Sequence, residues 1–143
     1  MVHSIPSDAM PPVPPLLVVS RFQAPAASRS AFLADLAGAL DVLGAQHGCR
    51  TICLAQSTDD PDLVLVRSEW DSVGAYRRAL SAYDVKLQAI PLLSQAIDEP
   101  SSFEVIRDGV GPSAVVASSG LAADAGAVSL GSAAAPSVPS VGL

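Results

Sequence analysis

Basic residues are few in this chain, and they do not gather into a patch. The eight lysines and arginines are scattered between Arg21 and Arg107, and 14 acidic residues give a formal net charge of −6. A protein that binds the phosphate backbone of a nucleic acid needs a clustered positive surface. The composition therefore argues against a nucleic-acid partner.

Long apolar runs are also missing from the sequence. No window approaches the roughly 18 to 20 uninterrupted apolar residues that a membrane-spanning helix needs, and no basic segment precedes an apolar one at the N-terminus. We therefore expect no membrane span, and we expect a soluble, cytoplasmic protein.

Cysteine is too scarce to suggest a disulfide framework or a zinc site. The chain has two, Cys49 and Cys53, four positions apart in a segment that reads as one strand. At the rise of a strand their Cα atoms would lie about 13 Å apart, which is too far for a disulfide. Two thiols without a matching pair of ligands do not make a zinc site either, so we expect free cysteines and no metal.

The two ends of the chain lack the patterns of folded structure. Five prolines within the first fifteen residues favour extended, solvated chain. From Gly109 to Leu143 the sequence is almost entirely Ala, Ser, Gly, Val and Pro, with Asp124 as its one charge. Such a composition does not offset the entropy of ordering. We predict a flexible arm over 1–15, a folded domain over 16–108 and a disordered tail over 109–143.

The folded domain begins with the first of two runs of consecutive apolar residues, at 16–19 and 63–66. Successive side chains of a strand point to opposite faces, so such runs are typical of strands that are covered on both sides. Together with turn residues at 58–62, the pattern predicts strands over 16–22, 49–56 and 63–70. A short, partly alternating segment at 103–107 predicts a last strand near a sheet edge.

Two helices are predicted between these strands. The first follows the candidate caps Ser28 and Ser30 and ends at Gly44 or Gly48. Its apolar residues recur at spacings of three and four and make one stripe, which consists of Phe32, Leu33, Leu36, Leu40 and Leu43.

The second helix begins after Asp71 or Ser72 and presents a narrower apolar face, made of Val73, Tyr76, Leu80 and, further along, Tyr83. A further helical piece starts near Val85. Pro91 lacks a backbone donor, and we expect it to break that piece between residues 90 and 92.

The resulting order is β-α-β-β-α-β with an extra helical segment. It predicts an α+β protein of ferredoxin-like topology, an antiparallel sheet with helices on one face. Such a sheet leaves its other face bare. An apolar patch formed by Val18, Ile52, Val64 and Val66, or by their neighbours one residue along, would then be exposed unless something covers it. We expect a homodimer in which two sheets pack face to face about a two-fold axis.

Four short segments follow one another at characteristic spacings: Gly48-Cys49, Asp60-Pro61, Glu69-Trp70-Asp71 and Val73-Gly74-Ala75-Tyr76. By their order and spacing, residues 16 to 107 resemble the antibiotic biosynthesis monooxygenase (ABM) family of dimeric α+β barrels. The resemblance implies the barrel fold. Some members oxidise aromatic polyketides with molecular oxygen and without metal or flavin, others degrade haem, and many have no demonstrated activity.

The resemblance also implies candidate site residues. Trp70 matches the family's tryptophan at the end of the third strand, and Tyr76 matches an aromatic position that lines a cavity in polyketide-oxidising members. The histidine of many relatives falls near Ala79 here, which disfavours haem chemistry because haem needs an axial ligand. The chain contains no asparagine, so a mechanism that uses an asparagine amide must find another donor.

Each candidate also has a structural interpretation. Trp70 can stack on a planar substrate or anchor the core. Tyr76 and Tyr83 can donate phenolic hydrogen bonds to a quinone-like ligand or simply pack. Arg21, like Arg67 and Lys86, can bind an anionic group or form an ordinary ion pair. We assign Trp70, Tyr76 and Tyr83 as candidate substrate-binding residues and leave the catalytic residues unassigned.

Two hypotheses on function follow. The first is a cofactor-independent monooxygenase that acts on a small aromatic or polyketide-type compound, with molecular oxygen as co-substrate, as the resemblance implies. The alternative is a non-catalytic dimeric protein of the same fold that binds a ligand or has a structural role. The absence of asparagine, and of the histidine that many relatives carry near the position of Ala79, favours this alternative. An isomerase or lyase would need an acid or base that faces the cavity.

Overall fold

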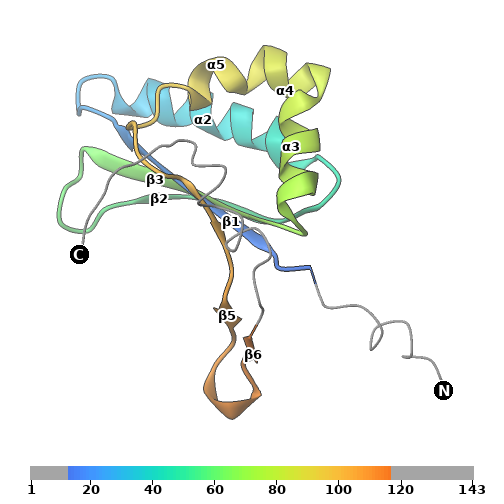
Figure 1. Cartoon of the computed structure of the whole chain (residues 1–143). Helices are drawn as coiled ribbons and strands as arrows, with labels where there is room; N and C mark the ends of the chain where they lie inside the picture. The colour runs from blue at the N-terminus through green and yellow to red at the C-terminus, as the bar shows by residue number, and fades with distance from the viewer. Residues whose placement is uncertain (1–12, 117–143) are drawn as a thin grey trace. The chain divides into compact units, whose positions relative to one another are not determined.

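The computed structural model describes residues 13–116. Val13–Val105 form one compact unit, and the described residues from Ile106 onward belong to a second one. The first unit contains four strands and four helices (Figure 1). In chain order these are β1 (Leu16–Gln23), α2 (Arg29–Gly44), β2 (Cys49–Gln56), β3 (Leu63–Trp70), α3 (Val73–Ser81), α4 (Tyr83–Gln88), α5 (Ile90–Leu93) and β4 (Ser102–Glu104).

The four strands form an antiparallel sheet in the order β2-β3-β1-β4, and the helices cover one of its faces (Figure 1). β1 pairs with β3 along its whole length, from Leu16 opposite Trp70 to Gln23 opposite Leu63. β4 pairs only with the first three residues of β1. The predicted ferredoxin-like α+β arrangement, with its helices on one face of an antiparallel sheet, is confirmed.

The bounds of the central elements agree with the sequence prediction. β2 and β3 have the predicted bounds, and α2 begins after Ser28 and ends at Gly44. At the start of α3 the hydroxyl oxygen of Ser72 accepts a hydrogen bond from the Ala75 amide at 3.1 Å, so Ser72 is the cap. Strong local signals, a turn before a strand or a cap before a helix, account for this agreement.

The break in the last helical region lies slightly before the predicted place. α4 ends at Gln88, Ala89 separates the two helices, and Pro91 lies inside the first turn of α5. The first turn is where a missing backbone donor costs least, because those amides have no partner within the helix. The proline thus begins a new helix instead of interrupting one.

The last strand is also shorter than predicted. β4 stops at Glu104, and the Val105 amide donates to the Pro15 carbonyl at 2.9 Å. Because β1 begins at Leu16, no strand remains for Arg107 to pair with in this sheet. Arg107 lies instead in a separate small hairpin of β5 (Arg107–Asp108) and β6 (Val115–Val116), joined through the short 3-10 helix η1 (Gly111–Ser113).

η1 and β6 lie between residues 109 and 116, within the span of the predicted tail. Residues 117–143 of that tail, and 1–12 of the predicted arm, lie outside the described residues. Within residues 13–116, no helix is both long enough and apolar enough to cross a membrane.

The core lies between the sheet and the helix layer. Every second residue of β1 and β3 points into it, and the buried members include Phe22, Val64 and Trp70. From α2 the predicted stripe contributes Leu36, Leu40 and Leu43, all of which are buried. Burial of such side chains is worth about 1.5–3 kcal/mol each, so this layer supplies most of the stability of the domain.

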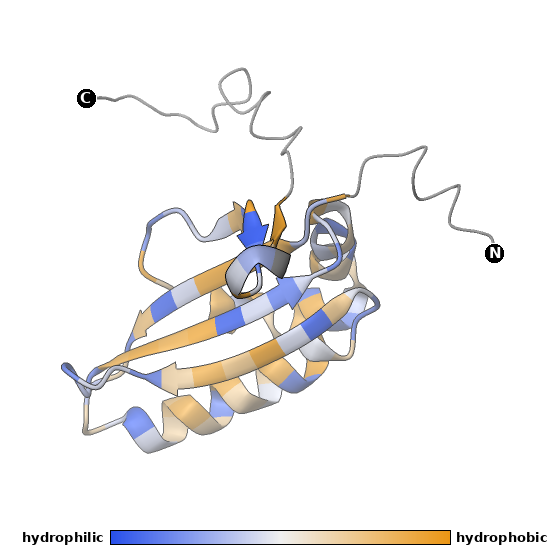
Figure 2. Cartoon of the chain, turned by 90° about the horizontal axis from the view of Figure 1, so that it is seen from below, coloured by the Kyte–Doolittle hydropathy of each residue, from blue (hydrophilic) through white to orange (hydrophobic). Residues whose placement is uncertain are grey.

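The opposite, open face of the sheet carries the alternate residues of the same strands. Val18, Val64 and Val66 are buried beneath the helices. The apolar patch on the uncovered face therefore consists of their neighbours one residue along, which was the second of the two alternatives that the sequence allowed. This face, which we call the open face, is seen from its own side in Figure 2. It includes Leu17, Val19, Cys53, Leu63 and Leu65, together with Arg21 and Arg67. A hollow of about 260 Å³ lies on it, between Arg21, Leu63 and Leu65.

The turn before β2 brings α3 close to the sheet. Gly48 has a φ of 93°, and a Cβ atom built there would lie 2.7 Å from the Cβ of Ala75. Only glycine combines this conformation with so close an approach. The Gly48 carbonyl also accepts from the Asp71 amide at 2.9 Å, which ties this turn to the end of β3. α3, and with it Tyr76, is therefore held against the end of the sheet.

Candidate functional site

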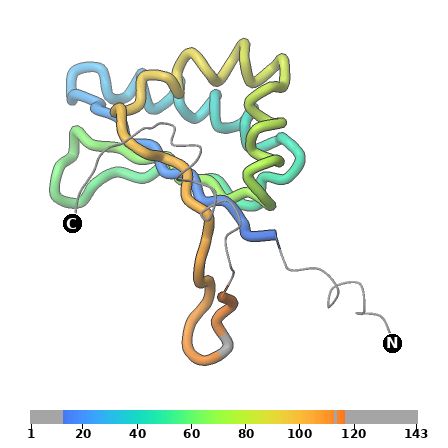
Figure 3. Tube along the Cα trace, in the orientation of Figure 1, coloured from blue at the N-terminus to red at the C-terminus, as the bar shows by residue number. Residues whose placement is uncertain are grey.

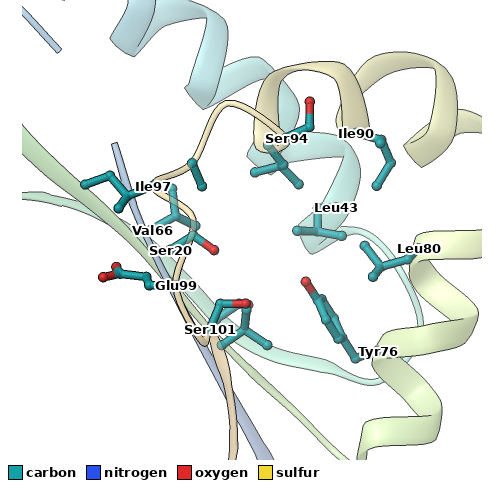
Figure 4. A pocket seen from close by; sticks show the side chains of 14 residues that line it. Ser20, Leu43, Val66, Tyr76, Leu80, Ile90, Ser94, Ile97, Glu99 and Ser101 are labelled. Atoms are coloured by element: carbon teal, nitrogen blue, oxygen red, sulfur yellow. The ribbon is translucent and has the colours of Figure 1, made fainter. Parts of the chain in front are cut away.

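A cavity of about 270 Å³ lies between the sheet and the helix layer. One wall comes from alternate residues of β1 and β3, and the other from α2, α3, α5 and the coil that follows α5 (Figure 4). The apolar lining residues are Val18, Leu43, Val66, Leu80, Ile90, Leu93, Ala96 and Ile97. The polar ones are Ser20, Ser68, Tyr76, Ser94, Glu99 and Ser101. The site is thus an apolar enclosure with hydroxyl groups on several sides, the composition typical of a small-molecule site.

Trp70 and Tyr76 form an aromatic pair at one end of this cavity. Their ring centroids are 5.3 Å apart at an interplanar angle of 54°. Trp70 is 0% exposed and is not among the residues that line the cavity. Tyr76 lines the cavity and directs its hydroxyl group into it (Figure 4). Burial raises the pKa of the Tyr76 hydroxyl, so this group stays protonated at neutral pH and can donate a hydrogen bond.

Trp70 is also fixed from its polar edge. Its indole Nε1–H donates to the Ser68 Oγ at 2.9 Å, and both residues project from β3 toward the helices. Ser68 is 1% exposed and is the one buried polar residue among the described residues. The sequence spacing of two places both side chains on one face of the strand, so this bond follows from the alternation of β3.

The coil between α5 and β4, residues 94–101, forms one side of the cavity, and we call it the strap. It runs alongside β1 (Figure 3), where the Ile97 amide donates to the Arg21 carbonyl at 2.8 Å and the Val19 amide donates to the Ser101 carbonyl at 2.7 Å. These hydrogen bonds attach the strap to β1 beyond the three residues of β1 that pair with β4. The strap therefore positions Glu99 next to the edge of β1.

Glu99 is the only carboxylate among the described residues that line the cavity, and it is paired. The Arg21 guanidinium donates two hydrogen bonds to it, from Nε and from Nη2, both at 2.7 Å. The hydrogen bond from Arg21 lowers the pKa of Glu99 below its usual range, so the carboxylate is charged at neutral pH. Of the two interpretations of Arg21, the ion pair is the one present, and its partner was not predicted.

The three sequence candidates separate in the structure. Tyr76 lines the cavity, and Trp70 supports it from the core. Tyr83 does not line the cavity and is 75% exposed. The helical spacing that joined Tyr83 to Tyr76 is interrupted, because α3 ends at Ser81 and Ala82 adopts an extended conformation before α4 begins. Tyr83 therefore lies outside the site that the other two residues share.

Ser68 and Glu99 are site residues that the sequence analysis missed. The alternation of β3 is a signal that could have found Ser68, since it lies two residues before Trp70 on the same face. No local signal points to Glu99, because its position depends on how the strap returns to β1.

No group of three or more His, Cys, Asp or Glu side chains within residues 13–116 could hold a metal ion. Cys49 and Cys53 are free thiols, as expected from their spacing.

Comparison with known proteins places these features in a family. The family model described as "Antibiotic biosynthesis monooxygenase" matches residues 15–86. Among curated proteins, none matches the chain. Several solved structures share the fold. SnoaB of Streptomyces nogalater, a cofactor-independent oxygenase solved as a mutant, is 20% identical over 70% of this chain and 99% of its own, with a TM-score of 0.58.

Two further structures are similar to a comparable degree. A conserved protein of Methanosarcina mazei Go1 is 18% identical over 64% of this chain and 93% of its own, with a TM-score of 0.54. Rv0793 of Mycobacterium tuberculosis is 19% identical over 69% of this chain and 98% of its own, with a TM-score of 0.51. At these identities the structures support the fold alone, whereas the family match covers half of the chain. The protein belongs to the antibiotic biosynthesis monooxygenase family.

Proposed function

We propose that the protein is a cofactor-independent monooxygenase that oxidises a small aromatic compound in the cavity between sheet and helices. The reaction would convert an activated ring methylene into a carbonyl. One atom of dioxygen enters the product, and the other leaves as water with the two methylene hydrogens. The electrons come from the substrate itself, so the step needs no external reductant.

The observation that carries the proposal is the Tyr76 hydroxyl group in an otherwise mainly apolar cavity. An electron-rich phenolate or enolate can transfer an electron to dioxygen, and the protein then has to orient the ring and stabilise charge on its oxygen. A protonated phenol in a mainly apolar cavity is suited to that task, because its hydrogen bond is weakened less there than in bulk water. Trp70 would keep the Tyr76 ring in place.

The cavity volume bears on the size of the substrate. At about 270 Å³ it lies just below the usual range for ligand pockets, which is roughly 300–1,000 Å³. A compound of two or three fused rings suits this space better than an extended polycyclic one. Half of the lining residues, from Ile90 to Ser101, lie beyond the segment matched by the family model, so the shape of the cavity depends on more than that segment.

We also propose that the functional unit is a homodimer formed through the open face. That face carries Leu17, Val19, Leu63 and Leu65 without cover from the helices. A standard interface buries roughly 800 Å² per partner, and its apolar part at about 25 cal/mol per Å² favours association over exposure. The cytoplasmic location expected from the sequence stays a prediction.

Oxygen consumption tests the proposed reaction. Purified protein is incubated with anthrone, 1,8-dihydroxyanthrone and two-ring phenols, and dioxygen uptake is followed beside the rate of each compound alone. We expect catalysed uptake with at least one of them. Tyr76→Phe should lower kcat/KM about tenfold or more, because it removes a hydrogen bond to a charged oxygen worth roughly 1.5–3 kcal/mol.

Tyr83→Phe is the matched control, since it makes the same change at a tyrosine outside the cavity. We expect it to retain the rate of the unmodified protein. Equal losses in Tyr76→Phe and Tyr83→Phe would contradict the assignment of the cavity. Absence of catalysed uptake with every compound would remove the support for a monooxygenase.

The second candidate function is a non-catalytic ligand-binding protein of the same fold. The observation that favours it is the lack of a free acid or base in the cavity, since Glu99 is engaged by Arg21 and no lining residue is His or Asn. The same observation disfavours an isomerase or lyase, which would need such a group. Tight binding of an aromatic compound without turnover would favour this second candidate.

A further inference from the structure

Among residues 13–116, no group accepts the hydroxyl hydrogen of Ser68. A serine hydroxyl can donate one hydrogen bond and accept two. In this structure Ser68 Oγ accepts from the Trp70 indole, and no hydrogen bond from Ser68 to an acceptor is present in the described part of the chain. At 1% exposure the residue is cut off from bulk water, yet it lines the cavity. The hydroxyl hydrogen of Ser68 is therefore available to an acceptor atom that enters the cavity.

The Trp70 bond determines which kind of atom Ser68 can serve. The indole Nε1–H is a donor only, so it occupies one lone pair of the Ser68 oxygen and leaves the hydroxyl hydrogen to be placed elsewhere. Accepting one hydrogen bond also makes a hydroxyl a better donor. The group that meets Ser68 in the cavity must therefore be an acceptor.

We infer that Ser68 is a substrate-binding residue that donates a hydrogen bond to a carbonyl or phenolate oxygen on the ring compound in the cavity. The inference rests on the proposed function for the choice of ligand, and on the geometry of Ser68 for its role. It also supplies the donor that a chain without asparagine needs. A carbonyl or phenolate oxygen attached to the ring accepts hydrogen bonds both before and after the oxidation. The Ser68 hydroxyl could therefore donate to it throughout the reaction.

The other serines of the cavity are less suited to this role. Ser94 is exposed, and its Oγ donates to the Pro91 carbonyl at 2.9 Å. Ser20 and Ser101 are only partly buried, so water can reach them more easily. Ser68 alone combines nearly complete burial with an acceptor role that is already filled.

A pair of probes of nearly equal shape tests the inference without turnover. 1-Tetralone has a carbonyl oxygen on its bicyclic frame, and tetralin has none. Binding is measured under nitrogen by two-dimensional NMR, in which the single tryptophan gives one indole N–H signal. We expect 1-tetralone to bind about tenfold more tightly than tetralin, which corresponds to one hydrogen bond in a buried site. We also expect it alone to shift the indole signal through the Ser68 oxygen.

Ser68→Ala should remove the preference and the indole shift, while Ser68→Thr, which keeps the hydroxyl, should retain the preference. Ser81→Ala is the matched control, because Ser81 does not line the cavity and its hydroxyl donates to the Arg77 carbonyl at 3.1 Å, and it should leave the ratio of the two affinities unchanged. Both Ser68 variants are first checked for folding by their NMR spectra. If Ser68→Ala does not fold, the Thr variant and the indole shift of the unmodified protein decide.

An unchanged ratio in folded Ser68→Ala would overturn the inference, and so would equal binding of both probes, or of neither, by the unmodified protein. These results are independent of oxygen uptake. Selective binding of 1-tetralone through Ser68 without any turnover would uphold Ser68 and contradict the monooxygenase. Turnover of a substrate together with an unchanged affinity ratio in Ser68→Ala would support the monooxygenase and contradict the role of Ser68.

Discussion

The two faces of the sheet carry similar apolar residues and differ in what covers them. Val64 and Leu65 are neighbours on β3, and one is 1% exposed beneath α2 while the other lies partly exposed on the open face. The covered face is closed by the chain's own helices and keeps a cavity within it. Within residues 13–105, no helix covers the open face. The comparison shows that burial here is decided by alternation along the strand, not by side-chain type.

The difference also separates the consequences of substitution. A change on the covered face acts on the folding of a single chain. A change on the open face acts on whatever association that face mediates. A charged residue at Val64 therefore tests the folding of the single chain, and a charged residue at Leu65 tests the association of two chains.

The largest effect is expected from Val64→Asp. Val64 packs in the cluster of Phe22, Leu36 and Val66, where a carboxylate would have neither water nor a cation. An unpaired buried charge costs several kcal/mol, a large part of the 5–15 kcal/mol that stabilises a typical domain. We expect the variant to be unfolded or to unfold at much lower urea concentration by circular dichroism. A urea midpoint equal to that of the unmodified protein would refute the assignment of this face.

Leu65→Asp is expected to leave the fold intact and to split the dimer. In a two-fold interface the substitution occurs on both partners, so two carboxylates would be buried near each other. We expect the dissociation constant to rise about a hundredfold or more in sedimentation equilibrium, with a circular dichroism spectrum like that of the unmodified protein.

Leu87→Asp is the matched control for this prediction, because Leu87 is an exposed leucine on α4, away from the open face. It should remain dimeric. A monomeric unmodified protein at micromolar concentration would contradict the proposed dimer itself.

The sequence predicted the frame of the fold better than the site. Strands β2 and β3 have strong turns on either side, and the apolar stripe of α2 has a regular period, so local signals define them. The sequence did not determine which side of each strand faces the core, because consecutive apolar residues such as Leu63 and Val64 show no alternation of apolar and polar residues. The packing of the helices determines it in the structure.

The site depends on contacts between distant parts of the chain, and these left weaker signals. Arg21 and Glu99 are 78 residues apart, and they meet only because the strap runs along β1 before β4 begins. Tyr83 was predicted from helical spacing, but Ala82 interrupts the helix before it. Ser68 lies two residues before Trp70 on the same side of β3, which the sequence shows. That its hydroxyl hydrogen has no acceptor among the described residues can be seen only in the structure.

The smallest effect is expected from the Arg21–Glu99 pair, which connects the two faces. Arg21 belongs to the open face, and Glu99 lines the cavity on the covered one. Because Arg21 lowers the pKa of Glu99, the pair contributes fully above the ordinary pKa of a glutamate, about 4.3. Its contribution is lost as the pH falls through the lowered value. The pair is partly exposed, so its effect on the unfolding midpoint should be slight.

The strap should report this titration directly. In the unmodified protein, the Ile97 amide, which donates to the Arg21 carbonyl, is expected to shift with pH around a midpoint below about 4.3. Glu99→Gln should abolish that midpoint and lower the thermal midpoint slightly. If a second copy covers the open face, Arg21 loses solvent and the pair is screened less, so the variant should lose more stability in the dimer than in monomeric Leu65→Asp. Equal losses in both backgrounds would show that the two faces act independently.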